Sequence, residues 1–167
     1  MEKLWSPWRS KYIESFKSDP NSSECIFCQM AKLDPDDTDS LIVHKGKFTF
    51  TLLNLYPYNN GHLMIVPYRH TSDFTSLSRE EYSESMENLQ LAQKALLKVL
   101  NPHGFNIGAN IGRVAGAGIE DHIHFHIVPR WNGDSNFMPV IGDVKVISQD
   151  LLETKTRLIE AYSELLM

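Results

Sequence analysis

The sequence predicts an α+β fold in which helices pack on an antiparallel β-sheet, and three observations lead to this prediction. Histidine alternates with large apolar residues from His122 to Val128, which is the side-chain period of a β-strand. Earlier in the chain, two apolar runs flank a glycine, as in a β-hairpin. Apolar residues after Ser78 recur at helical spacing. Because 42% of the 167 residues are hydrophobic, we expect residues 1–167 to form one domain with a substantial core.

The charge and the hydropathy of the chain exclude two classes of partner. The formal net charge of −5 argues against nucleic acid, because no basic stripe is available to neutralise a phosphate backbone. Small anions remain compatible, since histidines and backbone amides attract them locally. No apolar run approaches membrane-spanning length, and the segment from Met1 to Trp5 lacks the core of a signal peptide. We therefore expect a cytoplasmic protein that does not contact a membrane.

The first part of the chain carries an aromatic segment at residues 5–9, a short helical stretch to about Phe16, and then the pair Cys25 and Cys28. A thioredoxin-like redox motif needs a strand before the pair, whereas residues 18–24 are polar and typical of a loop. A metal site is therefore favoured over redox chemistry. Two thiols that only pack as small apolar groups are the alternative.

A zinc ion held by this cysteine pair would need further ligands, because structural zinc is tetrahedral. His70 lies at the end of an apolar run, and His122 begins the histidine pattern. These two imidazoles are the natural candidates. The sequence thus predicts a Zn²⁺ site made by Cys25, Cys28, His70 and His122.

Strand patterns follow the cysteine pair. Residues 41–44 and 48–53 are apolar runs separated by Lys-Gly-Lys, in which Gly46 offers a positive φ for a hairpin turn. Residues 56–61 are rich in turn formers, and they lead into a third predicted strand at 62–66. We expect these strands to form an antiparallel meander.

A long amphipathic helix is predicted after the third strand. Ser78 followed by Glu81 forms a capping box, and Asn101 with Pro102 ends the helical pattern. The apolar stripe is expected to face the core, because such stripes are how helices usually pack on sheets. Its members are Tyr82, Met86, Leu89, Ala92, Leu96 and Val99.

The last third of the chain contains two further strands and a second helix. A fourth strand is predicted at residues 104–109, and a glycine-rich stretch at 112–118 leads into the histidine strand at 122–129. Ser148 is expected to cap the final helix. Its apolar residues are Leu151, Leu152, Leu158, Ile159, Tyr162 and Leu165.

The histidine strand is the strongest candidate for a functional site. Three imidazoles, those of His122, His124 and His126, share one face and are expected to be open to a ligand. An open cluster can bind a phosphate or a metal, or attack an electrophile, whereas an inert surface strip and a pure metal site are the alternatives. Backbone amides around Gly116 and Gly118 would suit a polyphosphate. The other face would fill the core with Ile123, Phe125 and Ile127.

These residues resemble the histidine triad family, whose motif of three histidines alternating with apolar residues matches 122–128 throughout. The flanking segments 5–9 and 131–137 resemble more particularly the bacterial diadenosine tetraphosphate phosphorylase branch, which has ATP adenylyltransferase activity. Further elements with family counterparts extend over nearly the whole chain. They are Cys25 and Cys28, Asn54, Gly61 and His62, Val66 to His70, Asn110 to Gly112, and Pro129 to Trp131.

The resemblance implies a nucleotidyl transferase or hydrolase with a histidine-triad fold. Neutral His124 would attack the α-phosphorus and form a nucleotidyl-imidazole intermediate, which splits one difficult displacement into two easier ones. His126 would hydrogen-bond the phosphate or the bridging oxygen. His122 would be either a zinc ligand or an orienting residue, and we favour the ligand. The remaining substrate contacts implied are His62 at the phosphate, Asn54 at the ribose and Asn110 at the phosphate region.

Two further positions bear on substrate binding. Ala117-Gly118 stands where family members often carry Gly-Gln or Gly-Ser, so a backbone amide, Ser135 or Asn136 would contact the phosphates instead. Trp131 could stack on a nucleobase or simply pack after the strand, and both interpretations remain open.

Three functions follow from the resemblance and the residues. The first is phosphorolysis of a dinucleoside polyphosphate, with inorganic phosphate as the acceptor. The second is hydrolysis of dinucleoside polyphosphates or nucleoside phosphoramidates. The third is a non-catalytic module that binds a nucleotide or zinc. The resemblance also implies a homodimer whose sheets are joined, and no organic cofactor.

Overall fold

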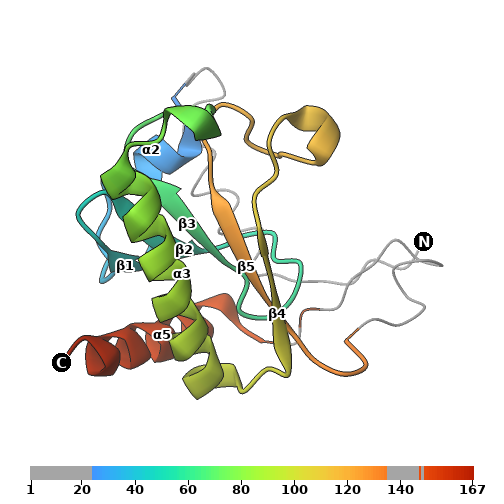
Figure 1. Ribbon diagram of the computed structural model, residues 1–167. Helices are drawn as coiled ribbons and strands as arrows, with labels where there is room; N and C mark the ends of the chain where they lie inside the picture. Colours follow the sequence, from blue (N-terminus) through green and yellow to red (C-terminus); the bar gives the residue numbers. More distant parts are fainter. Residues whose placement is uncertain (1–23, 135–146, 148) are drawn as a thin grey trace.

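The computed structural model describes residues 24–134, 147 and 149–167 (Figure 1). Several predictions fall outside these residues. They are the N-terminal aromatic segment and short helix, the proposed substrate contacts Ser135 and Asn136, and the proposed helix cap Ser148.

Five strands form one sheet in the order β1-β2-β3-β5-β4, and every neighbouring pair is antiparallel. The first three strands are a meander, as expected, but β5 is inserted between β3 and β4. The α+β class with an antiparallel sheet is thereby confirmed, and β4 lies at the edge. The strands are β1 (Ile42–Lys45), β2 (Thr49–Leu53), β3 (Leu63–Pro67), β4 (Gly104–Gly108) and β5 (Phe125–Arg130).

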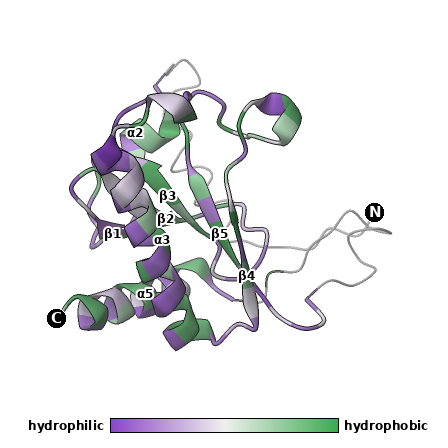
Figure 2. Ribbon diagram, viewed as in Figure 1, coloured by the Kyte–Doolittle hydropathy of each residue, from purple (hydrophilic) through white to green (hydrophobic). Residues whose placement is uncertain are grey.

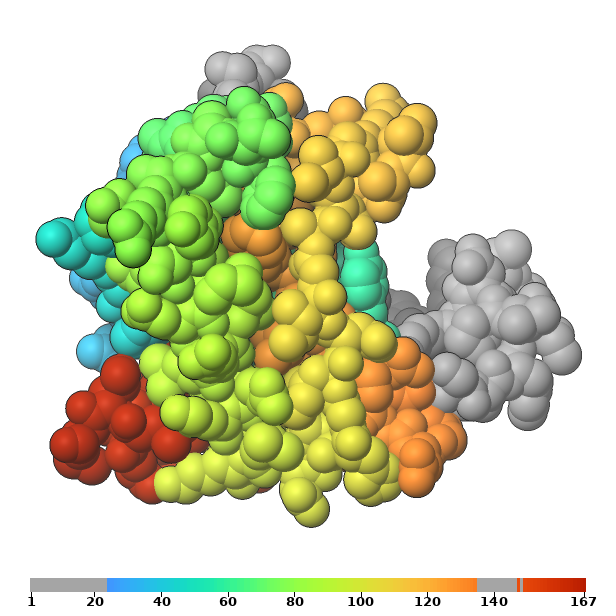
Figure 3. All heavy atoms as spheres, in the orientation of Figure 1, coloured from blue at the N-terminus to red at the C-terminus, as the bar shows by residue number. Residues whose placement is uncertain are grey.

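The helices are α2 (Ile26–Met30), α3 (Arg79–Leu100) and α5 (Leu151–Leu166), with single 3₁₀ turns η1 (Phe74–Ser76) and η2 (Arg113–Ala115). The long helix α3 crosses the sheet in Figure 1 and contacts β2, β3 and β5, while α5 packs against α3 and β1. The strand β3 is buried along its whole length and hydrophobic in Figure 2. The chain around η2 projects from the surface in Figure 3. Val114, the central residue of η2, is fully exposed.

The β1–β2 turn contains Gly46 as predicted, but glycine is needed there for a different reason from the predicted positive φ. Gly46 is not among the glycines with a positive φ. Instead, a Cβ built on Gly46 would lie 2.0 Å from the Glu84 carboxylate on α3. That carboxylate accepts hydrogen bonds from the backbone amides of Phe48 and Thr49 and so fastens the turn to α3. Glycine is needed here for close approach.

The helix α3 begins and ends as predicted. Ser78 and Glu81 form both hydrogen bonds of the capping box, and Asn101 ends the helix with φ of 47°. The predicted apolar stripe is only partly right, because Tyr82 and Met86 are 47% and 43% exposed. The N-terminal half of α3 turns polar residues inward instead. Glu81 pairs with Arg69, Ser85 donates to the carbonyl of Glu81 within the helix, and Asn88 donates to Thr49 at the start of β2. These three residues are buried, and the apolar residues Leu89, Ala92 and Leu96 are buried further along.

The cap of α5 is Asp150 rather than the predicted Ser148. The Asp150 carboxylate accepts hydrogen bonds from the amides of Leu152 and Glu153, and a carboxylate at a helix N-terminus is favoured by the helix dipole. Leu151, Leu158 and Tyr162 of the predicted stripe are buried, whereas Leu152 and Leu165 are exposed. Within the described residues, no helix has the length and apolar character needed to cross a membrane.

Candidate active site and metal centre

The histidine segment keeps its alternation, although β5 begins only at Phe125, so that His122 and His124 precede the strand. The expectation of an open cluster is wrong: His122, His124 and His126 are only 0%, 5% and 8% exposed. The cover comes from neighbouring rings. The Phe27 ring lies 4.9 Å from that of His124, and the Tyr58 ring lies 5.8 Å from that of His126.

The tautomer of His124 is fixed by the backbone. Its Nδ1 lies 2.8 Å from the carbonyl oxygen of His122, and because a carbonyl only accepts, this nitrogen carries the proton. Burial lowers the pKa of His124, so the ring is neutral near pH 7. The lone pair of Nε2 is therefore free to act as a nucleophile.

A second tautomer is fixed through His62. The backbone amide of Tyr58 donates to Nδ1 of His62, so Nε2 of His62 carries the proton and donates to Nδ1 of His126 over 2.9 Å. Nε2 of His126 must then be protonated, and this buried N–H has no partner among the described residues. The rings of His124 and His126 are 4.8 Å apart. A nucleophilic lone pair thus lies beside an unsatisfied hydrogen-bond donor.

His62 is fully buried beside His126, and its Nε2 donates the hydrogen bond that sets the tautomer of that ring. Its role as a phosphate contact stays a prediction. Burial, with the neighbouring imidazoles as a second cause, lowers the pKa of His62 to about 3 and that of His126 to about 4. Both rings therefore stay neutral well below pH 7.

Asn54 lies between the imidazoles and an apolar cavity. Its Nδ2 is 3.3 Å from Nδ1 of His62, and its Oδ1 accepts from the amide of Tyr56. The cavity beside it has a volume of about 100 Å³. Sequence reasoning missed this cavity, because its walls come from segments far apart in the chain. They include Ile26, Phe27, Met30, Leu53, Met64 and Ile119.

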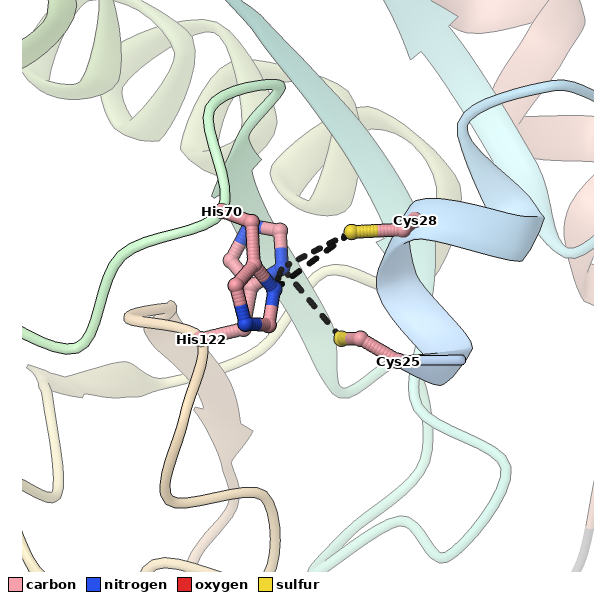
Figure 4. Close-up of side chains that lie close together, drawn as sticks. All are labelled: Cys25, Cys28, His70 and His122. Atoms are coloured by element: carbon pink, nitrogen blue, oxygen red, sulfur yellow. Dashed lines mark hydrogen bonds between the residues drawn. The ribbon is translucent and has the colours of Figure 1, made fainter. Parts of the chain in front are cut away.

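The four predicted metal ligands converge (Figure 4). The donor atoms of Cys25, Cys28, His70 and His122 all lie within 4.8 Å of one another. Nε2 of His122 donates to the carbonyl of Pro67 over 2.8 Å, which leaves Nδ1 unprotonated toward the cluster. A backbone carbonyl on the far nitrogen is the usual support of a metal-bound imidazole. The cluster could hold a metal ion, while the backbone of His122 orients His124.

The structure shows only local contacts for the remaining predicted substrate residues, so their substrate roles stay predictions. The amide of Asn110 lies 3.5 Å from the carbonyl of Gly116, so it braces the glycine loop. Gly116 has φ of 91°, as its place after η2 requires, and Gly118 has open space around its Cβ position. Trp131 follows the far end of β5, and its amide donates to Asp134.

The antiparallel sheet and the alternating buried imidazoles define a structural class of protein, and comparison with known sequences gives that class a name. The HIT domain, named after the histidine triad, matches residues 36–133, and the chain belongs to this family.

Relatives within the family include enzymes. A protein of Mycobacterium tuberculosis named AP-4-A phosphorylase is 44% identical over 160 residues, which cover 93% of this chain and 81% of that protein. An adenosine 5'-monophosphoramidase of Schizosaccharomyces pombe is 30% identical over 65% of this chain and 75% of its own. A zinc-bound histidine triad protein of Mycobacterium smegmatis superposes with a TM-score of 0.67 at 26% identity, covering 85% of this chain and 95% of that one.

Proposed function

We propose that this protein is a nucleotidyl transferase that cleaves diadenosine tetraphosphate and similar dinucleoside polyphosphates, with inorganic phosphate as the preferred acceptor. The observation that carries the proposal is the pair of fixed tautomers, which places an imidazole lone pair beside an imidazole N–H donor. Phosphoryl chemistry needs both groups, one to attack phosphorus and one to assist the departing oxygen.

In the first step, Nε2 of His124 attacks the α-phosphorus and the bond to the bridging oxygen breaks. The N–H of His126 donates to that oxygen, so that ATP leaves diadenosine tetraphosphate and an adenylyl group stays on His124. In the second step, an oxygen of inorganic phosphate attacks the same phosphorus and His124 departs. The products are then ADP and ATP.

The apolar cavity is the proposed nucleobase site. Its walls are almost wholly apolar, and it opens beside Asn54, which we propose contacts the ribose. Tyr56 lines the same cavity and is 53% exposed. A flat purine ring gains from burial against such apolar and aromatic side chains.

We propose that the metal cluster holds a structural Zn²⁺. With zinc–sulfur bonds of about 2.3 Å and zinc–nitrogen bonds of about 2.0 Å, a tetrahedral ion separates nitrogen from nitrogen by about 3.3 Å and nitrogen from sulfur by about 3.5 Å. The Nδ1 atoms of His70 and His122 are 3.3 Å apart, and each lies 3.4 Å from a cysteine sulfur. Four protein ligands close the coordination sphere, so the ion would supply stability and not an activated water.

The edge strand β4 supports a proposed homodimer. Ile107 on β4 and Ile111 just after it are each 52% exposed, and the outer edge of β4 is paired with no other described strand. Unpaired sheet edges and exposed apolar residues are usually covered.

The acceptor is tested by product analysis. Diadenosine tetraphosphate is incubated with the protein with and without inorganic phosphate, and AMP, ADP and ATP are separated by chromatography. We expect ADP and ATP in equal amounts only when phosphate is present. AMP and ATP regardless of phosphate would show a hydrolase, the activity class next favoured by the phosphoramidase relative. No turnover would favour a nucleotide-binding module.

A further inference from the structure

The short helix α2 lies between the metal cluster and the apolar cavity. Cys25 caps α2 and Cys28 lies within it, so two of the four donors come from this segment. Ile26, Phe27 and Met30 of the same segment line the apolar cavity. A second hollow, beside the donors Cys25, Cys28 and His70, shares the wall residue Ile119 with that cavity. One turn of helix thus separates the two sites.

Phe27 connects both sites to the nucleophile. Its side chain is only 2% exposed, and its ring lies 5.5 Å from the ring of His122 and 4.9 Å from that of His124. The carbonyl of His122 in turn holds Nδ1 of His124. A shift of α2 would therefore move two metal donors, one wall of the cavity and the ring packed against His124, which would carry the adenylyl group.

A helix of five residues is too short to be stable alone. What holds α2 in place is the burial of Phe27 and Met30 together with the convergence of its cysteines on His70 and His122. An ion that joins these four donors would fix α2 against the histidine segment. A nucleobase packed on Phe27 would fix the same helix from its other side.

We propose that metal binding and nucleotide binding are cooperative, and that Phe27 is the positioning residue that links them. The inference rests on the proposed nucleotide and zinc sites. Because coupling between two ligands is reciprocal, the metal should tighten nucleotide binding by the same factor by which the nucleotide tightens metal binding.

The first test measures AMP affinity by calorimetry in the zinc-loaded and the chelator-treated protein. We expect zinc to tighten AMP binding by between about 5-fold and 150-fold, the usual range of such coupling. The reciprocal test starts from the loaded protein and follows zinc release to an excess of chelator, with and without AMP. Slower release with AMP is expected, and this measurement needs no stable zinc-free protein. Equal AMP affinities, or equal release rates, would overturn the proposal.

Two variants locate the coupling. Phe27→Leu keeps the four donors and an apolar side chain but loses the aromatic ring, so it should still bind one zinc while AMP slows zinc release much less. Phe74→Leu makes the same substitution at a 47% exposed ring outside α2, so it is the matched control and should retain the full effect. Full coupling in Phe27→Leu would exclude the assigned role.

A third readout separates this proposal from the proposed function. The NMR signals of the Phe27 ring report its packing against His122 and His124, and zinc removal should shift them, whereas the signals of the distant Phe105 ring should not move. If AMP binds neither form, the nucleotide site is wrong, and the Phe27 signals still test whether the metal positions α2. Unchanged Phe27 signals together with unchanged zinc release would contradict the link itself.

Discussion

Two backbone groups decide what the buried imidazoles can do. The carbonyl of His122 accepts a hydrogen bond from the protonated nitrogen of His124. The amide of Tyr58 fixes the tautomer of His62, and His62 in turn fixes the tautomer of His126. Neither arrangement depends on a charged side chain. The residues therefore have different chemical roles although all are neutral histidines, one with a free lone pair and one with a free N–H.

Replacing His126 should slow the departure of the leaving group. His126→Ala removes the N–H that donates to the departing oxygen, and loss of one such hydrogen bond to developing negative charge typically costs about 10²- to 10³-fold in rate. The kcat for diadenosine tetraphosphate should fall in this range. With the nitrophenyl ester of AMP, whose leaving group carries its negative charge without such a donor, the loss should be much smaller. Equal losses on both substrates would contradict the donor role.

For the helices and strands, the sequence predicted local features but not long-range contacts. Ser78 with Glu81 and Asn101 mark the ends of α3 correctly, because capping depends on residues close in sequence. The inward-facing polar half of α3 was missed, since Glu84 and Asn88 bond to β2 and its turn, about 35 to 40 residues earlier in the chain. The apolar cavity was missed for the same reason.

The β1–β2 turn gives a test of this packing. Gly46→Ala would place its Cβ against the carboxylate of Glu84, which is held by backbone amides, and overpacking of this kind costs about 1–3 kcal/mol. Urea denaturation should show that loss in the free energy of unfolding. Gly108→Ala, whose Cβ would meet nothing within 4 Å, is the control and should change stability by less than about 0.5 kcal/mol. Equal effects of the two changes would refute the explanation given for Gly46.

The geometry of the site depends on the order of the strands in the sheet. Because β5 lies between β3 and β4, His126 pairs with Met64 of β3. His62 immediately precedes this same strand. The alternating histidine pattern predicted that His122, His124 and His126 lie together, but it did not predict that His62 would be buried beside His126. Sequence alone does not give strand order, and burial follows from strand order.

The buried imidazoles should make folding stability depend on pH. The pKa of His126 is about 4 in the folded protein, below the ordinary value of 6.5, so the unfolded chain takes up a proton that the folded chain cannot. Stability is fully present above about pH 6.5 and falls by about 1.4 kcal/mol per pH unit for each such histidine as the pH drops toward 4.

Urea denaturation between about pH 4 and 8 measures this dependence. His126→Asn should flatten the curve, while Gln90→Ala, a change at an exposed residue that does not titrate, should not. All three proteins keep the four metal donors. Any stability lost because a bound metal ion dissociates at low pH is therefore the same in each of them. Parallel curves for the wild type and His126→Asn would show that the ring is not held neutral.

If His124 carries the nucleotide between the two steps, mass spectrometry of the protein and its peptides after rapid acid-free quenching should detect the covalent intermediate. Incubation with diadenosine tetraphosphate in the absence of inorganic phosphate should add the mass of one adenylyl group, on the peptide that contains His124. Added phosphate should remove it, and His124→Ala should never acquire it. An adduct on another residue, or turnover by His124→Ala at the wild-type rate, would contradict the account.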